Sequence, residues 1–211
     1  MPMFRRLILA LMLTIPLCGI GTVADATAAP ADPMPPRVTS ADRILGRADA
    51  PVTVIEYGSF ACPHCAEWEI GVFQAFRERY IDTGQVRFVF RDLPTEPVQE
   101  AIRAASIARC AAPERYFDVV HALFLWQGTA RNIGPVSDWY DRAIAVSGRS
   151  PDEISACTAD PAVAAAIWRM AQAGAAAGAA KTPTFFINGR RLEGVVPIED
   201  LAAVIDPFLN R

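Results

Sequence analysis

The chain has 211 residues, of which 52% are hydrophobic, and a formal net charge of −3. This length is enough for one compact domain or for a small domain with an insertion. The charged residues form no block of one sign. Without a basic stripe, the sequence lacks the electrostatic pattern of a nucleic-acid-binding protein, and we expect no nucleic-acid partner.

The first residues are typical of a targeting segment. Arg5 and Arg6 form a short positive region, an apolar run follows at 7–17, and the small residues at 26–28 match a cleavage pattern. We predict a signal peptide at 1–28, cleaved after Ala28 or, as a second choice, after residue 24, and therefore a periplasmic location. The alternative is a retained membrane anchor, for which the apolar stretch is short.

Cys18 lies in the segment that such cleavage would remove. The mature chain then keeps four cysteines, Cys62, Cys65, Cys110 and Cys157. An even number of cysteines in an exported protein favours disulfide chemistry over metal binding.

The first part of the mature chain predicts a βαβ unit. Residues 29–46 are rich in Ala, Pro and Asp and predict a flexible leader. Residues 52–57 are β-branched and aromatic, as in a strand buried on both faces. From Pro63 the apolar residues recur at three- and four-residue steps, which predicts a helix ending near Gly84. Residues 86–90 predict the second strand.

The rest of the chain predicts a helical block and then a ββα unit. Segment 94–180 reads as helices separated by prolines, and the alanine-rich end of it favours close packing. Residues 184–187 predict a strand, Asn188-Gly189 a type I′ hairpin turn, and residues 191–195 the returning strand. Residues 197–209 predict a closing helix.

Together the outer units predict an α/β fold, the thioredoxin fold, with an inserted all-helical domain. The predicted division is a signal peptide at 1–28, a leader at 29–46, the βαβ part at 47–93, the helical insertion at 94–180 and the ββα part at 181–211.

The Cys62-Pro63-His64-Cys65 motif has two main interpretations, half of a zinc site or a redox-active disulfide. Zinc needs two further ligands, usually a second Cys-x-x-Cys or a spaced His pair. Apart from His64, the only histidine is His121, in the helical block. The strand-to-helix position of the motif therefore favours a redox-active Cys62–Cys65 disulfide, and we expect no bound metal or cofactor.

The position of Cys62 favours its thiolate. Unpaired N–H groups and the helix dipole stabilise negative charge at a helix N-terminus, where Pro63 is also suited to the first turn. His64 adds a polar and potentially cationic side chain next to the sulfur. A stabilised thiolate stabilises the reduced form, so the disulfide form acts as an oxidant. Cys65, one turn further, is expected to be buried and to resolve mixed disulfides.

These motifs together resemble those of a known family. Glu56, the Cys-Pro-His-Cys motif, the helical insertion and Thr182-Pro183 followed by Thr-Phe-Phe-Ile-Asn-Gly resemble the DsbA-type periplasmic thiol:disulfide oxidoreductases. The resemblance covers the chain from about residue 47 to its end.

The resemblance implies roles for three residues. Pro183 would be cis and pack against the active-site disulfide, which would leave the Thr182 backbone free to pair with an extended substrate. Glu56 would be a buried acid that helps proton transfer at the cysteines. From the sequence alone, Glu56 could instead be a strand-edge residue that points to solvent.

Cys110 and Cys157 lie on different predicted helices. They could be inert buried thiols or a structural disulfide, and export together with the even number favours the Cys110–Cys157 bond. Some DsbA-like proteins are similar in carrying an extra disulfide in the helical domain. We expect His121 to be a packing residue, and Trp126, Trp139 and Trp168 to lie in the core.

Three functions remain open. The first is a dithiol oxidase that acts on reduced or misoxidised exported proteins and is re-oxidised by a membrane redox partner. The second is an isomerase or reductase, favoured by Thr182, since the best-known oxidases of the family carry valine there. Against the isomerase, the leader is too short for the separate dimerisation domain that those enzymes use. We expect a monomer. The third is a chaperone in which the cysteines are redox-inactive.

Overall fold

A computed structural model describes residues 35–210 of the chain, all within the unit formed by residues 33–211. The predicted signal peptide and the first part of the leader lie outside the described residues. No helix among residues 35–210 combines the length and the apolar character needed to cross a membrane.

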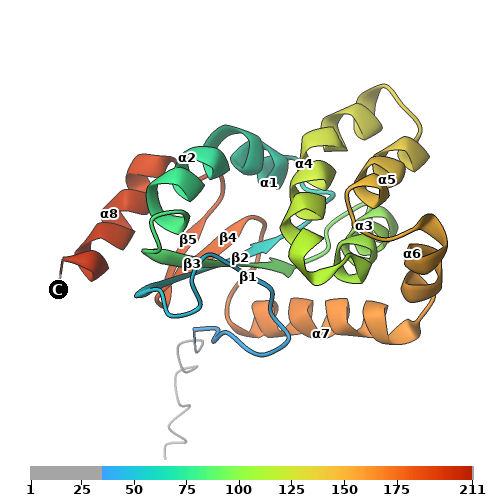
Figure 1. Ribbon diagram of the computed structural model, residues 1–211. Coiled ribbons are helices and arrows are strands. Elements are labelled where there is room, and N and C mark those ends of the chain that lie inside the picture. The colour runs from blue at the N-terminus through green and yellow to red at the C-terminus, as the bar shows by residue number, and fades with distance from the viewer. Residues whose placement is uncertain (1–34, 211) are drawn as a thin grey trace, which may run out of the picture. The chain divides into compact units, whose positions relative to one another are not determined.

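A five-stranded mixed sheet with the strand order β1-β3-β2-β4-β5 forms the centre of the fold (Figure 1). The central strand β2 is parallel to β3, whereas β1 pairs antiparallel with β3, and β4 pairs antiparallel with both β2 and β5. The strands are β1 (Ile44–Leu45), β2 (Val52–Gly58), β3 (Val86–Asp92), β4 (Thr184–Ile187) and β5 (Arg190–Glu193).

Strand β1 lies in the segment predicted as a flexible leader. Its two residues pair with Val89 and Phe88 of β3. A strand this short shows no alternation of polar and apolar residues, so the sequence pattern did not predict it.

The helices follow the predicted order. They are α1 (Pro63–Trp68), η1 (Glu69–Phe73), α2 (Gln74–Phe76), η2 (Arg77–Ile81), α3 (Val98–Cys110), η3 (Pro113–Arg115), α4 (Tyr116–Asn132), α5 (Val136–Ala145), α6 (Pro151–Thr158), α7 (Pro161–Ala176) and α8 (Ile198–Leu209). The segment from α1 to η2 is one continuous helix with two π-helical stretches, η1 and η2. The three- and four-residue apolar pattern predicts that helix but not its π-helical turns.

The two faces of the sheet carry alternate residues of β2. Val52 and Val54 belong to the core cluster beneath the helix that starts with α1, whereas Ile55 and Tyr57 belong to a second cluster on the other face. Figure 1 shows α1 and α2 on one side of the sheet and α7 on the other. Since side chains alternate along a strand, Glu56 lies on the same face as Val54 and therefore faces α1.

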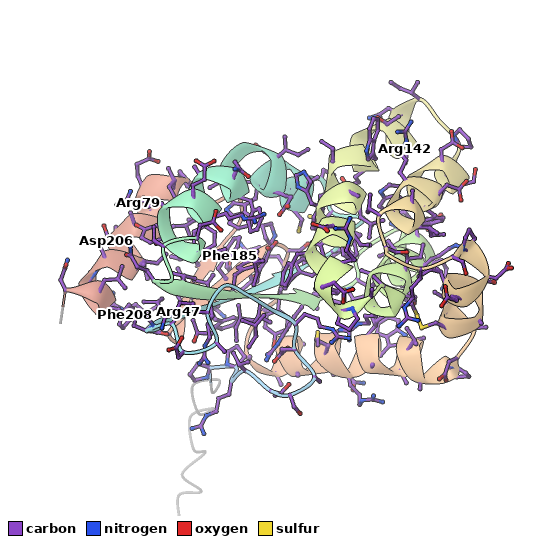
Figure 2. All side chains as sticks on the ribbon, in the orientation of Figure 1. Arg47, Arg79, Arg142, Phe185, Asp206 and Phe208 are labelled. Carbon is purple, nitrogen blue, oxygen red and sulfur yellow. A yellow bond between two sulfur atoms is a disulfide. The ribbon has the colours of Figure 1, made fainter. Side chains whose placement is uncertain are left out.

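An aromatic cluster fills the space between the sheet and the α1–η2 helix. The Trp68 ring lies 4.7 Å from the Phe185 ring and 6.2 Å from the Phe88 ring, centroid to centroid. Figure 2 labels Phe185 in this layer, and it also shows Arg79 and Asp206 close together between the helix and α8. The Arg79–Asp206 ion pair is 3.1 Å long.

Helices α3 to α6 form the insertion beside the sheet, and α7 returns beneath it (Figure 1). A disulfide between Cys110 of α3 and Cys157 of α6 links two of these helices across 47 residues of chain. Ser150 caps α6 in a capping box with Glu153, and Asp160 caps α7.

The expectation of three core tryptophans in this region is correct only for Trp139, which is buried. Trp126 is half-buried and stacks on the Arg142 guanidinium, whereas Trp168 is 45% exposed on α7, so its placement in the core was wrong. The buried residues of α7 are Ile167, Ala171 and Gly174, and the Trp168 indole is on the outer side of the helix.

Candidate active site

Cys62 lies at the junction between β2 and α1. It is the N-cap residue of α1, Pro63 is the first helical residue, and the Cys62 N–H donates to the Ser59 carbonyl oxygen at 3.0 Å. Cys62 is 8% exposed and Cys65 is fully buried, and both are free thiols, which is the reduced form of the pair. Only the Cys62 sulfur is therefore open to attack a partner.

The surroundings of Cys62 lower the pKa of its thiol to about 5. The largest cause is the hydrogen bond from the Cys65 thiol to the Cys62 sulfur, and burial acts in the opposite direction. The Thr182 side chain and the backbone N–H groups of Cys65 and His64 also favour the thiolate. Those N–H groups belong to the first turn of α1, where they stabilise negative charge on the Cys62 sulfur. The Cys62 side chain makes no capping hydrogen bond to α1.

We expect the reduced protein to show a thiolate that titrates with a midpoint near pH 5, seen in the ultraviolet absorbance of the thiolate. A Cys65→Ala variant removes the largest cause, so its midpoint should move upward toward the ordinary value of 9.0. A midpoint near 9.0 in the wild type would contradict this description of the site.

The pKa of the Cys65 thiol is shifted in the opposite direction to that of Cys62. Burial raises the pKa of its thiol well above the ordinary range, and the hydrogen bond to Cys62 and the charge of Glu56 act in the same direction. The Ser59 N–H lies 3.5 Å from the Cys65 sulfur. Cys65 therefore keeps its proton in the reduced form and needs a base before it can attack a mixed disulfide.

Thr182 and Pro183 lie against the cysteines. The Cys62 sulfur is 3.4 Å from the Thr182 carbonyl oxygen, and the Thr182–Pro183 peptide bond is cis. The segment leads directly into β4, which is antiparallel to β2. The main chain of Thr182 is thus placed beside the sulfur that a substrate must approach.

Glu56 is 1% exposed, on the central strand of the sheet, so the alternative of a solvent-facing edge residue does not fit. Burial, the charge of Glu69 and the charge of Cys62 raise the pKa of its carboxyl well above the ordinary value. Its Oε1 atom has no hydrogen-bond partner among the described residues. A buried carboxyl with a raised pKa can hold a proton near the cysteines.

His64 itself is exposed, and its contribution to Cys62 comes from its backbone N–H group. In the described part of the chain, no cluster of three or more His, Cys, Asp or Glu side chains is arranged to hold a metal ion.

Gln127 of α4 is a site residue that the sequence analysis missed. It is buried, and its Nε2 donates to the Phe60 carbonyl oxygen at 2.5 Å and to the Cys62 carbonyl oxygen at 3.1 Å. The helical insertion thus holds the backbone of the active-site loop. A single polar residue on an apolar helix face was the only signal, and it does not reveal which carbonyls it binds.

A Gln127→Met variant should be destabilised, because it keeps the volume of the side chain but removes the donor of the Phe60 carbonyl oxygen and one of the two donors of the Cys62 carbonyl oxygen, which also accepts from the Ala66 N–H. The expected cost is about 1–3 kcal/mol of unfolding free energy. Denaturant unfolding measures it, with Gln99→Met, an exposed glutamine of α3, as the matched control. Equal stability of the two variants would show that the Gln127 contacts contribute little.

Glu69 and His121 form a second feature that the sequence analysis missed. His121 Nδ1 lies 3.0 Å from Glu69 Oε1, the Glu69 side chain is 4% exposed, and the His121 side chain is 54% exposed. The prediction of His121 as a packing residue was wrong. Its place on an apolar helix suggested burial, but the ring turns to a buried carboxylate and to solvent.

Comparisons with known proteins agree with this geometry. A family model described as thioredoxin matches residues 38–207. The crystal structure of alpha-DsbA1 from Wolbachia pipientis matches with a TM-score of 0.73 and 27% identity, over 82% of this chain and 93% of that chain. The chain belongs to the DsbA-like thioredoxin-fold family.

Two further proteins extend the comparison. Oxidised BdbD from Bacillus subtilis has the same fold, with a TM-score of 0.73 and 20% identity, over 85% of this chain and 98% of that chain. A Rickettsia bellii protein named as a candidate protein-disulfide oxidoreductase is 28% identical over 181 residues. These comparisons confirm the predicted thioredoxin fold with its helical insertion and the predicted class, thiol:disulfide oxidoreductase.

Two of the matched proteins are longer than the matched region. The match covers 82% of this chain and 67% of the Rickettsia bellii protein. A 34% identical match, over 82% of this chain, covers only 26% of a protein from Salinispora tropica named Na(+)/H(+) antiporter NhaA 3. The DsbA-like segment therefore also occurs as a minor part of a much larger protein.

Proposed function

We propose that this protein oxidises cysteine pairs of exported proteins by thiol-disulfide exchange through Cys62 and Cys65. The observation that carries the proposal is the contrast between the two thiols, since the pKa of Cys62 is lowered to about 5 while burial raises that of Cys65. The stable Cys62 thiolate is a good leaving group, which favours transfer of the disulfide to the substrate.

In the proposed reaction, a substrate thiolate attacks the Cys62 sulfur and the Cys62–Cys65 bond breaks. The second thiol of the substrate then attacks the substrate sulfur that is bonded to Cys62 in the mixed disulfide. A disulfide forms within the substrate, and Cys62 leaves as the thiolate. The carbonyl oxygen of Thr182, 3.4 Å from the Cys62 sulfur, supports docking of the substrate as an extended strand. Pro183 would hold that backbone beside the sulfur, and Glu56 would supply the proton that Cys65 takes up.

We also propose that the protein acts in the periplasm as a monomer and that a membrane redox partner re-oxidises it. The predicted signal peptide supports export, and membership of the DsbA-like family supports a partner that restores the disulfide. Reduced or misoxidised exported proteins would be the substrates.

The test mixes the oxidised protein with a reduced peptide that carries two cysteines, and in parallel mixes the reduced protein with a protein that carries scrambled disulfides. We expect fast oxidation of the peptide and slow recovery of the scrambled protein. Reshuffling without oxidation would overturn the oxidase proposal in favour of an isomerase, which Thr182 favours. Full biological activity of a Cys62→Ser variant would instead favour a chaperone.

A further inference from the structure

A surface cavity of about 300 Å³ lies beside the active-site loop, between that loop and the helical insertion. Ala61, the residue directly before Cys62, forms part of its wall. Gln127 of α4 forms another part, and its Nε2 donates to the Cys62 carbonyl oxygen at 3.1 Å. Because consecutive Cα atoms are about 3.8 Å apart, the cavity begins one residue from the reacting cysteine. Neither Thr182 nor Pro183 lines it, so a bound polypeptide would meet the cavity separately from the cis-proline segment.

The walls of this cavity are mostly apolar. Pro97 directly precedes α3, Val136 begins α5, and Trp139 lies one turn further on α5. Trp139 is 5% exposed, and its Nε1 donates to the Leu123 carbonyl oxygen at 2.6 Å, which fixes the indole. Pro97 and Val136 are both exposed. A fixed aromatic wall with two exposed apolar neighbours favours an aliphatic chain as the occupant, since its burial removes apolar surface from water.

Glu100 of α3 gives the cavity a negative charge. Among the described residues that line the cavity, it alone is charged, and it is partly exposed. Arg103, one turn further on α3, places its guanidinium over the Tyr140 ring, 5.1 Å from the centroid. None of the ion pairs between described residues includes Glu100. Its carboxylate is therefore available to a positively charged group that enters the cavity.

We propose that this cavity receives a lysine or arginine side chain of the substrate, close in sequence to the cysteine that bonds to Cys62. This inference rests on the proposed exchange function and adds a substrate preference to it. The aliphatic stem of the side chain lies along Trp139 and Val136, while its cationic end reaches Glu100. An uncharged aliphatic side chain fits the walls but leaves the carboxylate without a partner, and an acidic side chain is repelled.

The experiment measures the rate constant with which the oxidised protein oxidises reduced peptides that carry two cysteines. The peptides differ at one position, placed in turn at each of the two residues before and after the first cysteine, and occupied by lysine, norleucine, alanine or glutamate. At the best position, lysine should exceed norleucine by about two- to fivefold, as expected for an exposed ion pair. Norleucine should exceed alanine by about tenfold through partial burial of its stem, and glutamate should be the poorest.

Variants of the protein separate the two contacts. Glu100→Gln should bring the ratio of the lysine rate to the norleucine rate to about one, and Glu100→Lys should place glutamate above lysine. Val136→Ser should lower the ratio of norleucine to alanine and keep that of lysine to norleucine. Glu67→Gln, an exposed acid on α1 that does not line the cavity, makes the same change in net charge and should leave every ratio unchanged. Because each ratio compares peptides on one variant, differences in thiol reactivity cancel.

Equal rates for all four side chains at every position would overturn the inference. An equal loss of the lysine preference in Glu67→Gln and Glu100→Gln would do so as well, because it would indicate attraction by the overall charge of the protein. In both cases oxidation of the peptides would leave the proposed function intact. Failure of the wild type to oxidise any of the peptides would instead refute the proposed function, and the inference with it.

Discussion

A Cys65→Ser variant should accumulate mixed disulfides with its substrates, whereas Cys62→Ser should lose exchange altogether. Cys62 is the thiol with partial exposure and a pKa lowered to about 5, so it forms the first bond to the partner. Without the Cys65 thiol, that bond has no internal route to resolution. The loss of turnover in Cys62→Ser should exceed about a thousandfold, as expected for removal of a nucleophile.

Non-reducing gels and mass spectrometry of proteins captured on Cys65→Ser measure the first effect and identify the substrates. A variant with both Cys110 and Cys157 changed to Ala is the matched control, since this pair is bonded in the helical insertion and not at the site. Capture through residues other than Cys62, or none at all, would refute exchange at this pair.

A Glu56→Gln variant should become more stable near neutral pH and slower in exchange. Burial raises the pKa of the Glu56 carboxyl above its unfolded value. The folded state therefore binds this proton more tightly than the unfolded state, and the stability of the wild type falls as the pH rises above about 4.5. Glutamine keeps the shape of a protonated acid and removes this cost.

Thermal unfolding measured below pH 4.5 and near neutral pH tests the stability effect, which should appear only at the higher pH. Each kcal/mol gained corresponds to a rise of about 2–4 °C in Tm for a chain of this size. The Cys65-dependent step should slow by at least about tenfold, because a proton donor and acceptor is lost. Glu67→Gln, an exposed acid on α1, is the control; equal shifts in both variants would contradict a special role for Glu56.

Much of the fold could be predicted because its signals are local. The β-branched run at 52–57 predicted β2, and Asn188-Gly189 predicted the hairpin, in which both residues have positive φ. Caps at Ser150 and Asp160 gave the starts of α6 and α7. Strand β1 and the π-helical turns depend on tertiary pairing and on one extra residue per turn, which local patterns do not record.

Some residues of the candidate site could likewise be predicted from local sequence signals, and others could not. Cys62 and Cys65 stand in a motif, and their place at the strand-to-helix junction follows from the order of apolar segments. Gln127 and His121 come from the insertion, far along the chain, and become site residues only through the way in which α4 packs on α1. No spacing in the sequence relates them to the cysteines.

The hydrogen bonds from Gln127 to the active-site loop also determine whether the helical insertion can be separated from the thioredoxin fold. Thr95, at the start of the insertion, bonds through its N–H and its hydroxyl to the Ser59 side chain, at 3.1 and 3.0 Å. Together with the two bonds from Gln127, these contacts anchor the active-site loop to the inserted segment at two points. A minimal protein made by excising the helices would keep both cysteines but would lose the donors that fix their loop, so the insertion cannot be treated as a detachable module.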